Sequence, residues 1–181
     1  MVPGLWKLSP LSSKEATQFL NLKFNQMSKK NFCPEGYHSI TPGLAIKGVA
    51  EAINWYKNVF GAKEKMRMEN PDKTIGHAEL IIGDSMIMLG EENPEYNASP
   101  RTLNGNSINL YIYVADADAT IKKAKDNRAK VIKPAEDMFY GDRVGRIEDP
   151  FGYLWLVATH VRDVSSEEMQ KKMEEMAHEH A

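Results

Sequence analysis

Apolar and polar positions along this chain follow an order of strand, helix and three strands, and that order occurs twice. Strands are indicated by period-two alternation, and helices by apolar residues at helical spacing that end near a glycine or a polar residue. A polar stretch over 91–106 separates the two copies. The first copy is expected at 39–48, 49–61, 62–69, 75–83 and 85–91. The second is expected at 108–116, 117–128, 129–137, 142–149 and 153–160.

The repeat is also visible in the letters. Gly76, Glu79 and Gly83 match the spacing of Gly145, Glu148 and Gly152 in the second copy. One βαβββ unit covers only one face of its sheet with its helix, and apolar surface left in water costs roughly 25 cal/mol per Å². The sequence therefore predicts an α+β fold of two tandem βαβββ modules, whose curved sheets face each other across a cleft. Expected core residues are Trp55, Tyr56 and Phe60, with Met66, Met68, Met86 and Met88 packed under the helices.

The pattern divides the chain into three parts. Residues 37–162 are expected to form a single domain, with module one at 37–92 and module two at 107–162. Residues 1–36 form an N-terminal appendage, partly helical or disordered, and whether Met27 is the natural start stays open. Over residues 163–181 the sequence predicts a charged C-terminal helix that begins at a Ser-Ser-Glu-Glu capping sequence.

Composition and charge exclude several classes of protein. Apolar residues make up 42% and charged residues 27%, as in an ordinary globular protein. A formal charge of -2 argues against nucleic acid as a partner. No run approaches the ~20 apolar residues of a membrane helix, and the first residues lack a secretory signal. With Cys33 as the single cysteine, a cytoplasmic location is expected.

Letters in both modules resemble a known superfamily. The first module carries "GHAEL" and "IGDS", and the second carries "FYGDR" and "EDPFG". Over about 37–170 the chain resembles the vicinal oxygen chelate superfamily, which includes glyoxalase I, extradiol dioxygenases and the fosfomycin- and bleomycin-resistance proteins. It is most similar to the branch called PhnB-like. The resemblance implies a small-molecule ligand in the cleft and a homodimer, because many relatives build the cleft across a two-fold axis. Whether the cleft forms within one chain or across a dimer stays open.

The resemblance also implies a metal position that this chain does not match. Metal enzymes of the superfamily hold one divalent ion with four side chains, from the first and last strands of each module. Those positions fall at Thr41, Ile87, Asn109 and Leu156. Divalent metals in such sites prefer imidazole or carboxylate ligands. We therefore expect no metal, and a cleft like that of the bleomycin-resistance proteins.

Strand alternation predicts which side chains line the cleft. Around the turn at Gly83, His77 and Glu79 are expected to share a face with Ile87. In module two, Arg146 and Glu148 share a face with strand 153–160. The predicted ligand-binding set is His77, Glu79, Asn109, Tyr111, Tyr113, Arg146, Glu148 and Leu156.

Each polar candidate also has a structural interpretation. Glu79 and Glu148 could pair with a Lys or Arg of a neighbouring strand. Arg146 could pair with either of these carboxylates or bind an anionic ligand. Asp142 could form a local salt bridge with Arg143.

Two functions follow, and whether the protein is an enzyme stays open. The first is a small-molecule binding protein without a cofactor. The alternative is a glyoxalase-like lyase or isomerase, with His77, Glu79 and Glu148 as catalytic candidates around a displaced site, alone or with His160 and one divalent metal ion. A third reading is a structural module whose cleft is filled by its own side chains.

Overall fold

The computed structural model describes residues 32–93 and 95–179. The chain divides into two compact units, Met1–Glu35 and Gly36–Ala181. Nearly all of the predicted appendage, with Met27, lies outside the described residues. Gly36–Ala181 carries both modules, and among the described residues no helix is long and apolar enough to cross a membrane.

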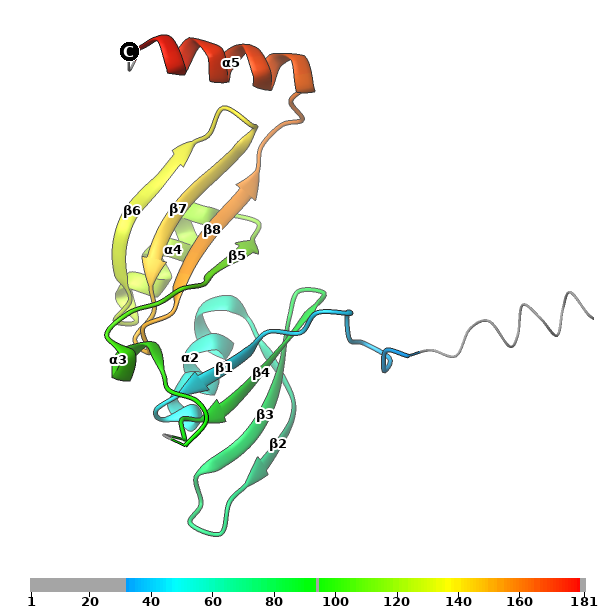
Figure 1. The fold of residues 1–181 in the computed structure, drawn as a ribbon, viewed down its shortest axis with the longest axis vertical. Coiled ribbons are helices and arrows are strands. Elements are labelled where there is room, and N and C mark those ends of the chain that lie inside the picture. The colour runs from blue at the N-terminus through cyan, green and yellow to red at the C-terminus, as the bar shows by residue number, and fades with distance from the viewer. Residues whose placement is uncertain (1–31, 94, 180–181) are drawn as a thin grey trace, which may run out of the picture. The chain divides into compact units, whose positions relative to one another are not determined.

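The first module is a four-stranded sheet covered on one face by a helix (Figure 1). The strand order is β1-β4-β3-β2, with β1 parallel to β4 and the other pairs antiparallel. Its elements are β1 (Gly43–Ile46), α2 (Val49–Phe60), β2 (Lys63–Glu69), β3 (Ile75–Ile82) and β4 (Ser85–Glu91).

The second module repeats this topology with the order β5-β8-β7-β6. Its elements are β5 (Asn109–Tyr113), α4 (Ala117–Asp126), β6 (Lys130–Asp137), β7 (Asp142–Glu148) and β8 (Leu154–His160). Between the modules lies the short helix α3 (Pro100–Leu103), which the sequence pattern did not indicate, and α5 (Ser166–Glu179) ends the described chain. The α+β class and the two βαβββ modules are confirmed.

Local chemistry explains where the main helices begin and end. The backbone N–H groups of Gly48 and Val49 donate to the Glu91 carboxylate, which caps the start of α2 from the end of β4. Gly61 ends α2 in the left-handed region at φ 67°. The Asp116 side chain caps α4 by accepting from the N–H of Ala119 at 2.9 Å.

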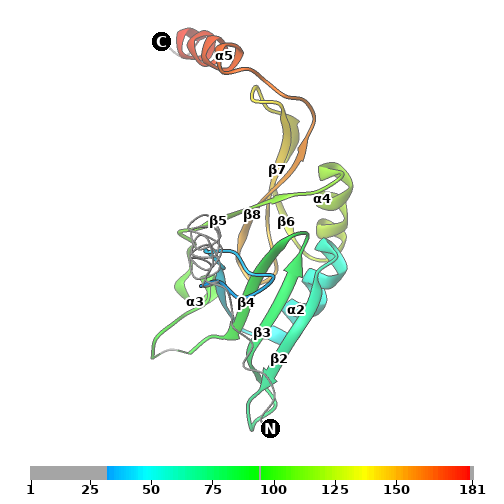
Figure 2. The same cartoon turned by 90° about the vertical axis from the view of Figure 1, so that its right-hand side faces the viewer.

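The two modules join through their helices. Figure 2 shows α2 and α4 beside each other on one side of the sheets. The fully buried Tyr56 of α2 donates to Asp149 Oδ2 at 2.8 Å and packs near the Trp155 ring of β8. Trp55 donates from its indole nitrogen to the Asn127 carbonyl at 2.7 Å. Trp55 and Tyr56 are therefore core residues, as predicted.

The sheets are not closed over each other within the chain. Each sheet has one face covered by its own helix and one face free of helix, here called its open face. Because the modules meet through α2, α4 and the β7–β8 turn, neither sheet covers the open face of the other. The expected cleft between facing sheets is therefore not formed by one chain alone.

In the first hairpin, the face on which the side chains of β4 lie differs from the prediction. The turn contains two residues, so Ile82 pairs with Ser85, and Glu79 pairs with Met88. A shift of one residue moves a strand's side chains to the opposite face. Ile87 therefore lies on the helix side, with Ser85 and Leu89, and the prediction that Ile87 shares a face with His77 and Glu79 was wrong.

The same shift decides where the methionines lie. Met66 and Met88 are register partners of Glu79, and Met68 is the partner of His77. All three lie on the open face, as does Met86 opposite Ile81. The expectation that these methionines pack under the helices was wrong, and Met66 and Met68 are 37% and 54% exposed.

Candidate functional site

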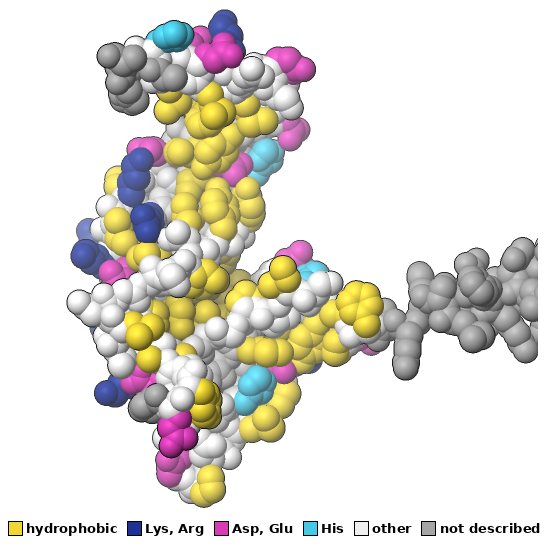
Figure 3. All heavy atoms as spheres, in the orientation of Figure 1, with side chains coloured by type: hydrophobic (Ala, Val, Ile, Leu, Met, Phe, Trp, Pro, Cys, Tyr) yellow, Lys and Arg dark blue, Asp and Glu magenta, His cyan; other side chains and the backbone are white. Residues whose placement is uncertain are grey.

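The open face of the second sheet carries the densest group of predicted site residues. Tyr111, Leu156 and Arg146 are register partners across three neighbouring strands, so they form one row. Asn109, Leu154 and Glu148 form the next row, and Tyr113 follows on the other side of Tyr111. The predicted alternation of this module is correct. Figure 3 shows hydrophobic side chains gathered over this sheet.

A buried carboxylate holds two tyrosines on this face. Asp142 is 4% exposed, and its Oδ2 accepts from the Tyr113 hydroxyl at 2.7 Å and the Tyr111 hydroxyl at 3.3 Å. The two rings lie with centroids 5.2 Å apart. Because both hydroxyl hydrogens are directed to Asp142, the rings form a fixed aromatic surface, although they remain 43% and 62% exposed.

His160 completes this cluster. Its Nδ1 lies 2.8 Å from Asp142 Oδ1, and its Nε2 lies 3.2 Å from Asp163 Oδ1. These hydrogen bonds, first that to Asp142 and then that to Asp163, raise the pKa of the imidazole. Burial opposes ionisation of Asp142, but the bonds from His160 and the two tyrosines outweigh it and lower the pKa of its carboxyl.

Asp142 does not form the expected salt bridge with its neighbour. Arg143 points to the helix side and pairs with Asp118 and Asp137. The two residues are adjacent in a strand, so their side chains lie on opposite faces. That prediction was wrong, and the alternation of strand 142–149 contained the signal that could have corrected it.

Arg146 lies across the open face, and no carboxylate among the described residues pairs with it. Its Nη2 donates to Asn109 Oδ1 at 3.0 Å. Its Nε is buried and has no hydrogen-bond partner among the described residues. Neither of the two ion pairs considered from the sequence, to Glu79 or to Glu148, is formed within the chain.

The predicted residues of the first sheet form a separate cluster. Glu79 is 5% exposed and accepts a hydrogen bond from the Tyr37 hydroxyl. His77 Nε2 lies 3.3 Å from Glu79 Oε1, and Lys65 Nζ lies 3.7 Å from Oε2. The Tyr37 bond, the His77 bond and the Lys65 charge lower the pKa of Glu79. Glu79 is therefore an ionised carboxylate already held by three partners.

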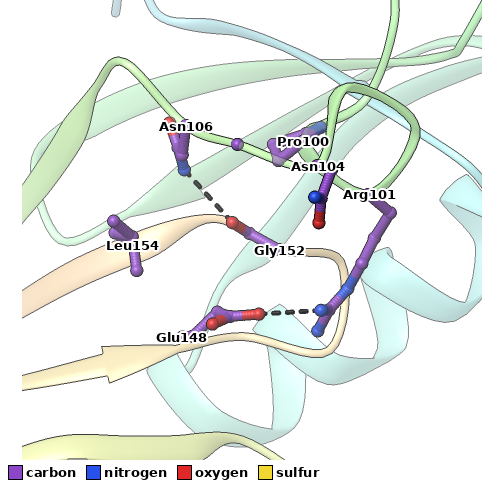
Figure 4. A pocket seen from close by; sticks show the side chains of 8 residues that line it. Pro100, Arg101, Asn104, Asn106, Glu148, Gly152 and Leu154 are labelled. Atoms are coloured by element: carbon purple, nitrogen blue, oxygen red, sulfur yellow. Dashed lines mark hydrogen bonds and ion pairs between the residues drawn. The ribbon is translucent and has the colours of Figure 1, made fainter.

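Glu148 lies elsewhere, at the turn end of the second sheet. Figure 4 shows it facing Arg101 of α3, with Nη1 and Oε1 2.8 Å apart. Arg101 also donates to the backbone carbonyls of Asp149 and Pro150. A cavity of about 250 Å³ beside this pair is lined in part by Asn106 and Leu154. The ion pair fastens the segment between the modules to the β7–β8 turn.

A larger cavity adjoins the tyrosine surface. It has a volume of about 430 Å³ and lies between the segment before β1, the β3–β4 turn and the edge strand β5. Small-molecule sites usually have ≈ 300–1,000 Å³ with apolar walls and a few polar groups. The residues that give this cavity that character are Ile40, Met86, Tyr111, Tyr113, Trp155 and His38.

The predicted set is thus divided among three places. Asn109, Tyr111, Tyr113, Arg146 and Leu156 share one open face. His77 and Glu79 lie on the other sheet, and Glu148 is bound to the segment between modules. The sequence reasoning missed Asp142 as the anchor of the tyrosines, and it considered His160 only as a metal ligand.

Comparison with known proteins places this architecture in a family. A family model described as the Glyoxalase/Bleomycin resistance protein/Dioxygenase superfamily matches residues 37–157. The chain belongs to this superfamily. Among its relatives, Mb0911c of Mycobacterium bovis is 33% identical over 139 residues, which cover 75% of this chain and 91% of that protein. At5g48480 of Arabidopsis thaliana is 26% identical over 117 residues, covering 61% and 70%.

Solved structures share the fold of this superfamily member. TioX from Micromonospora sp. ML1 has a TM-score of 0.54 at 23% identity, covering 71% of this chain and 100% of that chain. A structure titled as a PhnB protein from Bacillus cereus has a TM-score of 0.54 at 18% identity, covering 67% and 99%. These likenesses support the glyoxalase-like and PhnB-like fold expected from the sequence.

Strand pairing locates the residues at the four positions that the resemblance assigns to the superfamily's metal. Gly43 of β1 and Tyr111 of β5 are equivalent, because each lies six positions before the start of its module's helix. Gly43 pairs with Met88, and Tyr111 pairs with Leu156, so Met88 is equivalent to Leu156. The last-strand position of module one is therefore Met88, and not Ile87. Among the residues that the structure describes, no three His, Cys, Asp or Glu side chains are placed to hold a metal ion. The side chains at the four positions, Thr41, Met88, Asn109 and Leu156, do not fit a divalent metal.

Proposed function

We propose that this member of the superfamily is a small-molecule binding protein of the glyoxalase/bleomycin-resistance type that acts without the metal quartet. The observation that carries the proposal is the cavity of about 430 Å³ beside the tyrosine surface. Its tyrosines, Tyr111 and Tyr113, remain partly exposed although Asp142 fixes their hydroxyls. A surface that is ordered before binding loses little conformational entropy when a ligand stacks on it.

A homodimer is the second part of the proposal. Each open face leaves large apolar side chains exposed, and contiguous exposed apolar surface usually marks an interaction site. A second copy that covers these faces would remove this surface from water and deepen the cavity beside Tyr111. The exposed residues are Met66, Met68, Tyr111, Tyr113 and Ile132. Sedimentation velocity at micromolar concentration tests this part, and a purely monomeric protein would contradict it.

The alternative, a lyase or isomerase with a displaced site, requires His77, Glu79 and Glu148 to converge. His77 and Glu79 contact each other, but Tyr37 and Lys65 already hold the Glu79 carboxylate. Glu148 lies on the other sheet and is bound to Arg101. This arrangement supports binding over general-base catalysis. Zinc, nickel or manganese near one ion per chain, after purification without chelator, would reverse that preference.

A thermal-shift screen against drugs and small metabolites tests ligand binding directly. A ligand at a hundred times its Kd stabilises the folded state by about 2.7 kcal/mol. Tyr113→Ala should abolish the shift, because it removes one of the two rings of the tyrosine surface. Tyr96→Ala is the matched control, since Tyr96 is 77% exposed and lies outside the cavity lining. If no compound raises the melting temperature, the binding proposal is lost.

The compartment is part of the same proposal. Cys33 is the only cysteine of the sequence, which fits a reducing compartment such as the cytoplasm. Fractionation of cells that produce the native protein tests this expectation.

A further inference from the structure

Arg146 brings an uncompensated positive charge to the middle of the second open face. The five other arginines, Arg67, Arg101, Arg128, Arg143 and Arg162, each form an ion pair with a carboxylate. Within the described residues Arg146 forms none. Its position in the row with Tyr111 and Leu156 places it on an apolar and aromatic surface, and not on a solvated edge.

The nearby carboxylates are committed to other partners. Glu148 shares the strand and the face of Arg146, yet it pairs with Arg101 at 2.8 Å. Lys133, the register partner of Arg146, adds a second positive charge, but it is paired with Glu136. The one buried carboxylate of the first open face, Glu79, is held by groups of its own module. A second copy that presents Glu79 would therefore offer a carboxylate that is already neutralised.

The donors around Arg146 remain unsatisfied. The buried Nε has no acceptor, although a buried donor without a partner is costly and rare in folded proteins. Nη2 is bound to Asn109 Oδ1, and this bond leaves the Asn109 amide hydrogens available to another acceptor. A guanidinium and an amide that both offer hydrogens at one place match an oxyanion, because carboxylates accept such bonds in pairs.

We infer that Arg146 and Asn109 bind the carboxylate of an organic anion whose apolar body lies on Leu156 and Tyr111. This inference rests on the proposed binding function and names its ligand class, amphipathic carboxylates. The charge of the guanidinium selects the anion, and the tyrosine surface selects an aromatic or planar body. Rotation of the Arg146 side chain toward the carboxylate gives its Nε an acceptor.

Calorimetric titration with matched probes tests the inference. The probes are 2-naphthoate and its neutral isostere 2-naphthamide, titrated into the full-length protein. We expect wild type to bind the carboxylate about tenfold more tightly than the amide. Arg146→Met should reduce this preference to less than about twofold, because the carboxylate loses more binding free energy than the amide does. Arg146→Lys keeps the charge and should retain part of the preference. It keeps the inference testable if the methionine variant does not fold.

Arg143→Met is the matched control. Arg143 lies on the same strand but on the helix side, where it pairs with Asp118 and Asp137, so the preference should persist. Equal affinity of wild type for both probes, or an unchanged preference in Arg146→Met, would overturn the inference. It would also be overturned if Arg146→Met dissociated a dimer without altering the preference, since a second copy would then be the partner of Arg146.

The two proposals fail in distinguishable ways. If neither naphthalene binds but a neutral compound from the thermal-shift screen does, the anion inference fails and the binding function stands. If no compound of either charge binds, both fail together.

Discussion

The buried carboxylate of Asp149 holds the two modules together, so replacing it by asparagine should destabilise the whole domain. Asp149 is fully buried and lies at the start of the β7–β8 turn. Its Oδ1 accepts the N–H groups of Phe151 and Tyr153, each at 2.9 Å. Its Oδ2 accepts from Tyr56 at 2.8 Å and from the indole of Trp155 at 2.9 Å. These bonds connect α2 of the first module to the turn of the second.

The magnitude follows from counting donors. Asparagine keeps one acceptor oxygen for two of the four donors and places an NH₂ group before the other two. Each buried donor left without an acceptor costs about 1–3 kcal/mol. Two such donors give a loss of about 2–6 kcal/mol, a large part of the ~5–15 kcal/mol typical of a domain. Burial raises the pKa of Asp149, and the bonds that its carboxylate accepts offset this only in part. Asparagine carries no charge, so the variant avoids the cost of burying a charge, and this reduces the net loss of stability.

Urea unfolding, followed by circular dichroism at constant pH, measures the effect. Asp149→Asn should lower the free energy of unfolding by at least about 2 kcal/mol, and Tyr56→Phe by about 1 kcal/mol, because only one bond is lost. Asp137→Asn is the control, since Asp137 is exposed on β6 and its partner Arg143 keeps a second carboxylate; a change within about 0.5 kcal/mol is expected. A loss below about 1 kcal/mol in Asp149→Asn would refute the reasoning.

Two further predictions concern the second module. The pKa of His160 is raised by Asp142 and Asp163, so its stabilising contribution is complete below the unfolded value of about 6.5 and disappears as pH rises through the folded pKa. The difference in melting temperature between wild type and His160→Gln should therefore shrink above pH 6.5, and an NMR titration midpoint at or below 6.5 would contradict this. Gly145→Ala should destabilise by about 1–3 kcal/mol in urea, because a Cβ there would lie 2.9 Å from the backbone nitrogen of Ala135 and 3.0 Å from the carbonyl oxygen of Lys133 on β6. An unchanged midpoint would contradict this prediction.

Much of the candidate site could be predicted from the sequence because strand alternation is local. In module two the alternation correctly placed Tyr111, Arg146 and Leu156 on one face. In module one the alternation was carried across the turn at Gly83 in the wrong phase, so Ile87 was expected on the open face although it lies on the helix side. Alternation has a period of two, so an error of one residue inverts every side chain of the strand.

The letter repeat also misled the comparison of the modules. It matched Glu79 with Glu148, whereas strand pairing matches Glu79 with Arg146. Glu79 is the partner of Met88, and Arg146 is the partner of Leu156, in equivalent rows of the two sheets. The two modules therefore carry opposite charges at equivalent places, which the letters did not reveal.

By itself the sequence determined the two βαβββ modules and the order of their strands and helices along the chain. These features depend on apolar periods of two residues in strands and 3.6 residues in helices, which can be recognised within one segment of the chain. Only the tertiary structure decided that Tyr56 and Asp149, 93 residues apart, bind each other, and that Asp142 anchors two tyrosines. Such contacts join segments whose separation in the chain carries no information on their distance in space. They arise when the two modules pack together through α2, α4 and the β7–β8 turn and bury the apolar side chains between them.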